Sequence, residues 1–388
     1  MAEVSLTEEE KRELIEWRRN IHQYPELAYQ EKRTSEIVAR RLSEFGYPIQ
    51  KNVAGTGVVG LLKGRGGGKT LLVRADMDAL PVREENEVEY KSKNEGVMHA
   101  CGHDGHTAIL LMTAKKLMGE KNLRGNIKFV FQPAEEGGNG ALKMIEEGVL
   151  ENPKVDGALG LHLWNNLPVG KVAITPGPIL AAVDEFTLKI IGKGGHGAMP
   201  ETTIDPIVTA GQAITALQTI VSRNVSPLET VVLTIGAIHG GTAFNVIANE
   251  VVMKGTVRTY SMKVRDEISK RFEEIVKGVT SAMGASYQLD YRQVCLPTVN
   301  DFSMTEFARR VAVEVVGEEN IVVGERTMGG EDFSFFLNRV PGCFILVGSR
   351  NESKGFSHSH HSSRFNFDEE ALGIGVEIMR KAIPEFLK

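Results

Sequence analysis

The sequence predicts an α/β protein of two domains, in which a central mixed sheet flanked by helices carries an inserted domain of the ferredoxin-like type. Apolar strand-like runs alternate with helical patterns up to residue 183 and again after Pro297, which indicates a sheet covered on both faces. The residues between show the order β-α-β-β-α-β. At 388 residues the chain is also too long for one ordinary core. We therefore expect a larger domain of residues 1–183 and 298–388 with an insert of residues 184–297.

The larger domain is expected to begin with two helices, separated at Tyr24–Pro25 and ended by Gly46. The elements that follow are expected to be strands at 70–81, 126–132 and 157–166, alternating with helices at 104–120 and 141–150. Asp104 is the expected N-cap of the first of these helices. The glycine-rich run 63–70 lies between two strands with no helix after it, which favours a hairpin turn over a phosphate-binding loop.

The insert follows the same kind of periodicity with a different order. Its expected elements are a strand at 184–194, a helix at 203–222, strands at 229–241 and 249–260, a helix at 263–284 and a strand at 286–294. The α/β character returns after the insert with a helix at 303–316, a strand at 343–348 and a closing helix from Asp368.

The composition argues against two classes of partner. A formal net charge of −5 gives no basic stripe for a phosphate backbone, so we expect no nucleic acid partner. No apolar run approaches the roughly 20 residues of a spanning helix, and the acidic start lacks the features of a signal peptide. We therefore expect no membrane association and a cytoplasmic location.

The three cysteines are odd in number and far apart, which argues against a disulfide framework and fits a reducing compartment. Cys295 and Cys343 lie in apolar runs and are expected to be buried and inert. Cys101 lies in the segment MHACGHDGH, among polar and small residues that would make a poor core. This contrast makes Cys101 the candidate for chemistry.

Side chains that can ionise or bind metal gather where the predicted strands end. They are Asp76, Asp78, Glu135, Glu136, His162, His358, His360 and His361. The carboxyl ends of the strands in an open α/β sheet face one crevice, so residues scattered along the sequence can meet there. The pattern therefore predicts a site at this edge of the sheet.

The run Cys101-Gly102-His103 places a thiolate and an imidazole close enough to share a site. Cysteine, histidine and glutamate are the ligands that hold zinc and similar divalent ions. His99 would join them if the segment is extended, and His106 would lie near His103 if a helix has begun. The residues alone leave both alternatives open.

The adjacent pair Glu135-Glu136, just past a strand and before two glycines, is harder to explain as structure. The alternative to function is a solvated turn. In the functional interpretation one carboxylate binds a metal and the other takes a proton from water, whose pKa falls from about 15.7 to about 7 beside a divalent ion.

Seven segments, spread in order over essentially the whole chain, resemble the M20 metallopeptidases. They are RADMDALPV, MHACGHDGH, FQPAEEGG, GLHLW, GKGGHGAMP, GGEDFSFF and HHSSRFNFDEEAL. The branch that is most similar contains amidohydrolases, aminoacylases and carboxypeptidases that act on N-acylated amino acids. The resemblance implies two divalent metal ions bridged by Cys101. The other implied ligands are His103, Glu136, His162 and His361, with Glu135 as general base and Asp78 as the aspartate that supports the centre.

Two features leave finer points open. Other M20 branches have a histidine ligand where this chain has Asp76 and a bridging aspartate where it has Cys101, so zinc is expected first and manganese, cobalt or nickel remain alternatives. The run SHSHH also leaves His360 as an alternative to His361.

In the family the insert dimerises and lends a histidine to the partner's active site. The segment GKGGHGAMP makes His196 the candidate, as a hydrogen-bond donor to the oxyanion. Asn245 and Arg258 resemble the residues that bind the substrate carboxylate, a task that suits the arginine fork. A surface charge is the alternative for Arg258, and His239 is a further candidate.

The expected function is hydrolysis of the amide between an acyl or peptidyl group and an amino acid with a free α-carboxylate, by a homodimer or a dimer of dimers. One alternative is a thiol hydrolase with Cys101 as nucleophile. Another is a protein that binds small carboxylates without catalysis.

Overall fold

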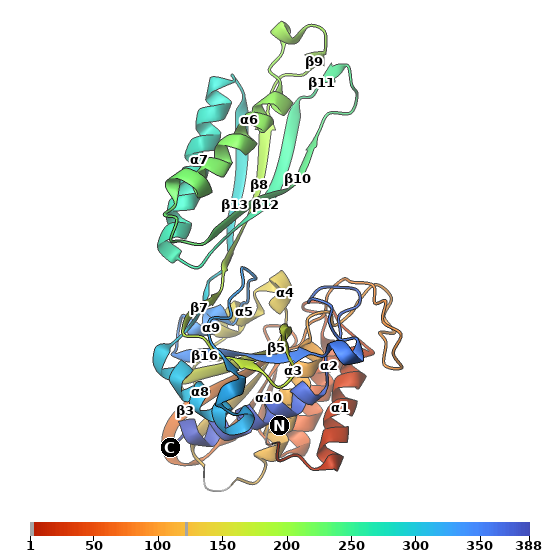
Figure 1. Cartoon of the computed structure of the whole chain (residues 1–388), viewed down its shortest axis with the longest axis vertical. Coiled ribbons are helices and arrows are strands. Elements are labelled where there is room, and N and C mark those ends of the chain that lie inside the picture. Colours follow the sequence, from red (N-terminus) through yellow and green to blue (C-terminus); the bar gives the residue numbers. More distant parts are fainter. Residues whose placement is uncertain (1–3, 121–122) are drawn as a thin grey trace. The chain divides into compact units, whose positions relative to one another are not determined.

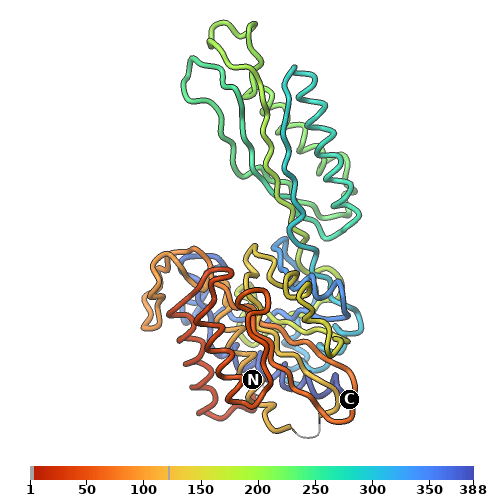
Figure 2. The backbone as a smooth tube through the Cα atoms, turned by 180° about the vertical axis from the view of Figure 1, so that it is seen from behind, coloured from red at the N-terminus to blue at the C-terminus, as the bar shows by residue number. Residues whose placement is uncertain are grey.

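The computed structural model describes residues 4–120 and 123–388, and its contacts divide the chain into two compact units. Unit 1 comprises Met1–Gly177, Val299–Arg326 and Asp332–Lys388, and unit 2 comprises Pro178–Thr298 and Thr327–Glu331. Figures 1 and 2 trace the chain through both units from opposite sides. The expected insert, residues 184–297, lies within unit 2.

Unit 1 contains an eight-stranded mixed sheet in the order β1-β2-β4-β3-β5-β16-β6-β15. The strands are β1 (Ile49–Val53), β2 (Gly57–Lys63), β3 (Arg65–Asp76), β4 (Arg124–Gln132), β5 (Gly157–Pro168), β6 (Val172–Ala173), β15 (Ile321–Val322) and β16 (Gly342–Arg350). Strand β3 is parallel to β4 and β5, and β16 is parallel to β5. The carboxyl ends of these four strands therefore lie at one edge of the sheet.

The predicted hairpin at the glycine-rich run is wrong. Strands β2 and β3 do not pair with each other but with opposite sides of β4. The link between them crosses the start of β4, where a Cβ on Gly64 would lie 2.4 Å from the carbonyl oxygens of Gly125 and Leu123. The glycine at this position therefore permits a close backbone approach.

Helices cover both faces of this sheet, as the sequence predicts. One core joins Leu71, Val73 and Ala75 of β3 to five helices. These helices are α1 (Glu8–His22), α2 (Lys32–Glu44), α3 (His103–Lys116), α8 (Phe302–Val316) and α10 (Glu370–Phe386). The shorter helices are α4 (Glu135–Gly138), α5 (Gly140–Glu146) and α9 (Ser334–Leu337). The aromatic rings of Phe333, before α9, and Phe344 of β16 are 5.3 Å apart.

The expected N-cap of α3 is also wrong. The helix follows Gly102, whose φ of 91° only glycine adopts freely, and Asp104 lies inside its first turn. The Asp104 carboxylate accepts hydrogen bonds from Arg18 Nε and His22 Nδ1, both at 2.8 Å. These buried partners occupy the side chain that the sequence assigns to the cap.

Unit 2 has the predicted β-α-β-β-α-β order. It consists of β8 (Ala182–Ile191), α6 (Pro206–Thr219), β10 (Val231–Gly240), β12 (Glu250–Thr259), α7 (Met262–Ala282) and β13 (Ser286–Cys295). The strands form an antiparallel sheet in the order β10-β12-β8-β13, which is the ferredoxin-like arrangement. Both helices pack on this sheet through one apolar core.

The remaining elements are short. They are the paired strands β9 (Gly195–His196) and β11 (Val246–Ile247), the paired strands β7 (Gly177–Leu180) and β14 (Thr298–Asn300), and the helical turns η1 (Pro200–Thr202), η2 (Ile220–Asn224), η3 (Glu318–Asn320) and η4 (Glu352–Lys354). Among the residues that the structure describes, no helix combines the length and apolar character needed to cross a bilayer.

Candidate metal centre

Five overlapping groups of potential metal ligands occur among the described residues, and two of them, at the carboxyl edge of the unit 1 sheet, contain Cys101. One group consists of Cys101, His103 and His162, and the other of Cys101, Glu136 and His361. Within each group the ligand atoms lie within 4.8 Å of one another. The structure therefore brings together the five residues that the resemblance implies as ligands. A Cys101 thiolate would be within reach of an ion held by either group.

The strand register explains this meeting. Arg74 of β3 lies opposite Gly160 of β5, so Asp76 and His162 are both two residues further along their parallel strands. Helix α3 begins with His103, which places Cys101 in the turn just before it. Residues separated by long stretches of sequence thus reach one edge of the sheet.

Hydrogen bonds orient two of the imidazoles. His103 Nδ1 donates to the Asp78 carbonyl oxygen at 2.9 Å, and its Nε2 is buried with no hydrogen-bond partner in the described part of the chain. His162 Nδ1 donates to the Leu163 carbonyl oxygen at 2.7 Å, and its Nε2 lies 3.4 Å from Cys101 Sγ. A backbone bond at Nδ1 fixes the tautomer in which Nε2 offers its lone pair to a metal.

The Glu135-Glu136 pair follows β4 and is held by Asp78. The two oxygens of the buried Asp78 carboxylate accept hydrogen bonds from Glu135 N at 3.0 Å and Glu136 N at 2.9 Å. The potential ligand atoms of Glu135, His103 and Glu136 also lie within 4.8 Å of one another. Asp78 therefore acts on the backbone that carries both glutamates, and the pair is not a solvated turn.

The histidine run near the C-terminus offers His361 and not His360 to this site. His361 has φ 65°, is half exposed, and its Nε2 lies 3.2 Å from Glu136 Oε1. His360 Nε2 instead donates to the Leu163 carbonyl oxygen at 2.9 Å, and burial lowers the pKa of His360 to about 4. His358 is exposed and belongs to none of the ligand groups found among the described residues.

His106 and His99 have other surroundings. His106 Nδ1 donates to Asp76 Oδ1 at 2.6 Å and its Nε2 accepts from Leu163 N at 2.9 Å, so both of its nitrogens are occupied. Burial lowers the pKa of His99 to about 4, and His99 lies in none of the ligand groups within the described ranges. His106 forms a ligand group with Asp76 and His103, but neither His106 nor His99 belongs to the two groups that contain Cys101.

Comparisons with known proteins agree with this geometry. The model of peptidase family M20/M25/M40 matches residues 72–385. The chain belongs to this family. It is therefore a hydrolase that acts on amide bonds. The M20 chain is 48% identical over 297 residues to an N-acyl-L-amino acid amidohydrolase of Geobacillus stearothermophilus, covering 76% of this chain and 80% of that one. It is 41% identical over 374 residues to thermostable carboxypeptidase 1 of Saccharolobus solfataricus, covering 94% of each.

A solved structure extends the comparison to the fold. The Bacillus subtilis YXEP protein, described as a dinuclear metal binding peptidase from the M20 family, superposes with a TM-score of 0.85 at 33% identity. The match covers 98% of this chain and 99% of that one. The architecture of the M20 chain is thus that of a catalytic domain with an inserted second domain.

The electrostatics of the M20 site suit bound cations. Burial and the carboxylates of Glu136 and Glu135 raise the pKa of Cys101 well above its ordinary value. Burial disfavours a charge on His103, but Asp76 and Asp78 outweigh it and raise the pKa of His103 to about 10. Carboxylates contribute to both shifts, although burial is the larger cause for Cys101. Sulfur, imidazole and carboxylate donors in such surroundings fit zinc and similar divalent ions.

The insert residues separate into two places within unit 2. His196 and Asn245 are neighbours, because β9 pairs with β11 and Gly197 N donates to the Asn245 carbonyl oxygen at 2.8 Å. Arg258 lies near the other end of β12, opposite Val183. Strand β8 begins beside Arg258 and leads toward His196. At roughly 3.3 Å per residue, its length separates Arg258 from His196 of the same chain by about 25 Å. One copy of unit 2 therefore does not bring these three residues together.

Sequence reasoning missed a buried network beside the M20 site. Arg74 binds Asp76 Oδ2 at 2.7 Å, Asp332 Oδ1 at 3.1 Å and Gln132 Oε1 at 2.8 Å. Asp332 also accepts from Ala141 N at 3.0 Å. Arg74 and Asp76 are two positions apart on one strand. The pairing of Arg74 with Asp332, however, joins distant parts of the sequence and leaves no local pattern that would predict it.

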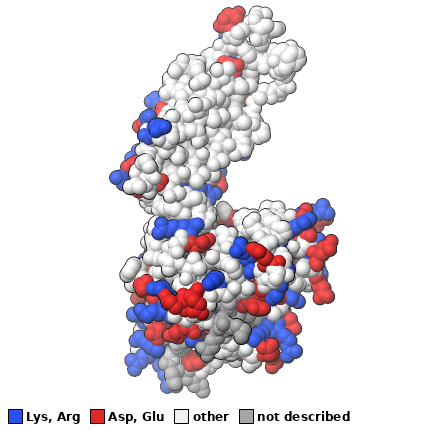
Figure 3. All heavy atoms as spheres, viewed as in Figure 1, with Lys and Arg blue, Asp and Glu red and all other residues white. Residues whose placement is uncertain are grey.

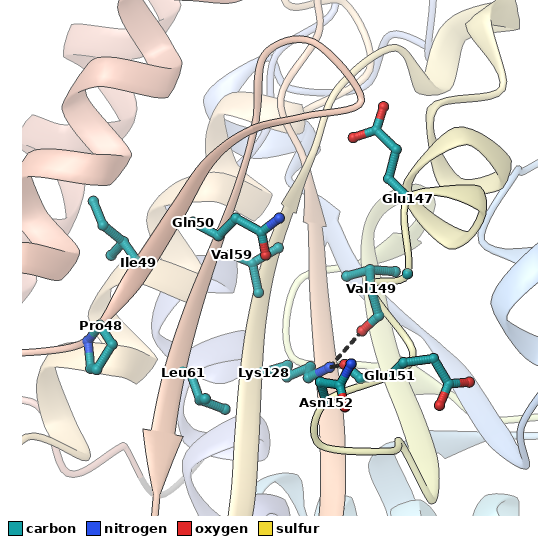
Figure 4. Close-up of a pocket in the computed structure, with 11 residues that line it drawn as sticks. Pro48, Ile49, Gln50, Val59, Leu61, Lys128, Glu147, Val149, Glu151 and Asn152 are labelled. Carbon is teal, nitrogen blue, oxygen red and sulfur yellow. Dashed lines mark hydrogen bonds between the residues drawn. The ribbon is translucent and has the colours of Figure 1, made fainter.

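A separate cavity of about 420 Å³ lies on unit 1 between β1, β2, β4 and the loop after α5 (Figure 4). Its lining is Pro48, Ile49, Gln50, Val59, Leu61, Lys128, Glu147, Gly148, Val149, Glu151 and Asn152. Lys128 Nζ donates to the Val149 carbonyl oxygen at 2.8 Å. The lining includes none of the predicted site residues, so this cavity is distinct from the metal centre.

Proposed function

We propose that this M20 enzyme uses two divalent metal ions to cleave the amide between an acyl or peptidyl group and an amino acid with a free α-carboxylate. The observation that carries the proposal is the shared position of Cys101 between two ligand groups, with a second glutamate beside them. Cys101, His103 and His162 would hold one ion, and Cys101, Glu136 and His361 the other. When bound, the ions polarise the substrate carbonyl and lower the pKa of a water.

The remaining residues have roles that follow from their chemistry. Glu135 takes the proton of the attacking water and delivers it to the nitrogen of the leaving amine. Asp78 keeps Glu135 and Glu136 in place through their backbone N–H groups. His196 donates to the oxyanion, and Asn245 and Arg258 bind the substrate carboxylate.

The proposal includes a homodimer. His196 and Arg258 lie far apart within one copy of unit 2, so a site that uses both takes them from two copies. Helix α6 contains no charged residue although Ile207, Val208 and Gln212 on it are exposed. Edge strand β10 is uncharged too, and the viewed face of unit 2 carries few charged side chains (Figure 3). A long uncharged edge strand is suited to pairing with a second copy.

The substrate class rests on two similar proteins. One is named an N-acyl-L-amino acid amidohydrolase and the other a carboxypeptidase, and both names imply an amide next to a free carboxylate. Zinc is the proposed ion, with manganese, cobalt or nickel as alternatives. A cytoplasmic location is proposed because the three cysteines are unpaired.

Two other functions have less support. A thiol hydrolase needs a nucleophile of lowered pKa, whereas the surroundings of Cys101 raise its pKa. A non-catalytic binding protein gives no role to Glu135, a second carboxylate beside Glu136.

The test combines metal reconstitution with Glu135→Gln. Protein stripped with a chelator and reloaded with zinc or manganese is assayed on a panel of N-acyl amino acids and dipeptides. Glu135→Gln should bind two ions per chain and lower kcat by about 10²–10⁴-fold, the usual worth of a general base. Turnover by Glu135→Gln at the wild-type rate contradicts the proposal. Activity that survives complete removal of metal but not alkylation of Cys101 would support the thiol mechanism instead.

A further inference from the structure

The loop that carries Glu135 and Glu136 adopts a backbone that its own residues do not favour. Ala134, directly before the pair, has φ 53° and ψ 47°, and Asn139 after it has φ 55° and ψ 41°. The left-handed region is disfavoured for residues with a Cβ, and alanine has no polar side chain to compensate. Glu136 and Gly137 also have non-helical dihedral angles within α4. The loop therefore depends on contacts from outside itself.

Two buried carboxylates hold three successive backbone N–H groups of this loop. Glu31 Oε1 accepts from Ala134 N at 2.9 Å. The oxygens of Asp78 accept from Glu135 N at 3.0 Å and from Glu136 N at 2.9 Å. The bond to Glu31 thus falls on the left-handed residue itself.

Tyr29, two residues before Glu31, holds the far end of the same loop. Its hydroxyl donates to the Gly138 carbonyl oxygen at 2.6 Å, and its backbone N donates to Glu31 Oε1 at 3.0 Å. A Cβ on Gly138 would lie 2.6 Å from Ala134 Cβ and 3.1 Å from the Tyr29 ring. The two side chains therefore contact both ends of a tightly packed turn.

The Glu31 side chain is not used to cap its own helix. Glu31 occupies the N-cap position of α2, but its side chain makes no capping hydrogen bond. Glu26 accepts instead from Arg33 N and Thr34 N, both at 2.9 Å. The second oxygen of Glu31 accepts from Thr56 Oγ1 at 2.5 Å. Glu26 thus accepts hydrogen bonds from the first turn of the helix, whereas Glu31 accepts one from the loop.

We propose that Glu31 and Tyr29 are positioning residues for the Glu135-Glu136 pair. They hold Ala134 in its left-handed conformation and so fix the direction in which both glutamates leave the backbone. The proposal rests on the proposed function for the roles of the two glutamates. Without these contacts the loop relaxes toward right-handed backbone, and the base moves away from the water and the substrate carbonyl. Such a displacement costs turnover more than binding.

The kinetic test compares Glu31→Ala with Glu26→Ala in fully metal-loaded protein. Alanine removes the oxygen that accepts from Ala134 N, and Glu31→Ala should lower kcat by roughly tenfold to a hundredfold while KM changes by less than about threefold. Glu26→Ala, a matched change in the same segment, should lower Tm and keep kcat. Adding Ala134→Gly to Glu31→Ala should recover part of the lost kcat, because glycine adopts the left-handed region without strain. Tyr29→Phe removes one hydroxyl and should lower kcat at an unchanged Tm, which keeps the test available if Glu31→Ala does not fold.

Hydrogen exchange gives a readout that does not depend on the reaction. The amides of Ala134, Glu135 and Glu136 should exchange slowly in the metal-loaded wild type, and Glu31→Ala should accelerate exchange at Ala134. Wild-type kcat in both Glu31→Ala and Tyr29→Phe, or unchanged exchange in both, overturns the proposal. So does a loss of kcat that only follows the loss of folded protein and that Ala134→Gly does not recover. Turnover by Glu135→Gln at the wild-type rate would contradict the proposed function but not the positioning role, because the exchange experiment does not depend on the reaction.

Discussion

Replacing Cys101 with serine should weaken both metal sites at once, because this sulfur belongs to both ligand groups. Under the proposed assignment, its removal would leave one ion with His103 and His162 and the other with Glu136 and His361. Structural zinc sites with four donors bind with about 10–16 kcal/mol, or roughly 3 kcal/mol per donor. The substitution should therefore raise Kd by about a hundredfold for each ion. Replacement of a residue that belongs to only one of the two groups, such as His361, should weaken the binding of mainly one ion.

The assay is metal content after dialysis against a weak chelator, followed by titration with zinc. Wild-type protein and Cys295→Ser, a buried cysteine outside every ligand group of the described residues, should retain two ions per chain. Cys101→Ser should retain less than one ion per chain. Cys101→Asp should keep both, because a carboxylate can bridge two ions as in the other M20 branches. Two ions bound to Cys101→Ser with wild-type affinity would refute the bridging role of the thiolate.

Three further predictions follow from the described contacts. Asp78→Asn leaves one oxygen for two backbone N–H groups, and a buried unpaired N–H costs about 1–3 kcal/mol. We expect a lower Tm and a kcat reduced by about tenfold or more, and wild-type kcat would contradict this role. Burial opposes a charge on His22, but Asp104 and Glu84 raise its pKa above the ordinary value. The stability that His22 contributes is therefore complete below about pH 6.5 and is lost as the pH rises through its folded-state pKa. His22→Gln should flatten the fall of Tm above that pH, and an unchanged slope would argue against the linkage. Ile238→Glu on edge strand β10 should yield monomers of low activity in sedimentation and kinetic measurements, whereas Gln288→Glu on the opposite edge strand β13 should not. An active monomeric Ile238→Glu variant would exclude a shared active site.

The sequence predicts the meeting of the ligands because the relevant rule is topological. Parallel strands expose their carboxyl ends at one edge, so His162 on β5 and the residues after β3 and β4 had to converge once these segments were strands. The strands and helices themselves follow from local periodicity, which needs no knowledge of distant residues. The choice between His361 and His360 was beyond this reasoning, because it depends on the left-handed backbone at His361.

Errors arose where distant partners decide a local feature. Asp104 has the side chain of an N-cap, but Arg18 and His22, brought in by α1, bind its carboxylate. The glycine-rich run resembles a hairpin turn, yet β4 lies between its two strands. The pairing of Arg74 with Asp332 joins residues that are 258 positions apart in the sequence, which no periodicity records.

Metal binding and proton release at this site form one equilibrium. The surroundings raise the pKa of Cys101 well above its ordinary value and that of His103 to about 10, so the metal-free protein holds a neutral thiol and a charged imidazole near neutral pH. Cys101 and His103 would each lose a proton on binding a cation, whose charge would then offset the nearby carboxylates Asp76 and Glu136. Burial, with the neighbouring carboxylates, makes Cys101 a poor nucleophile without metal, and the same carboxylates favour cations in the folded site. A buried thiol among carboxylates is costly in a thiol hydrolase, but beside a pair of divalent ions it becomes a thiolate ligand.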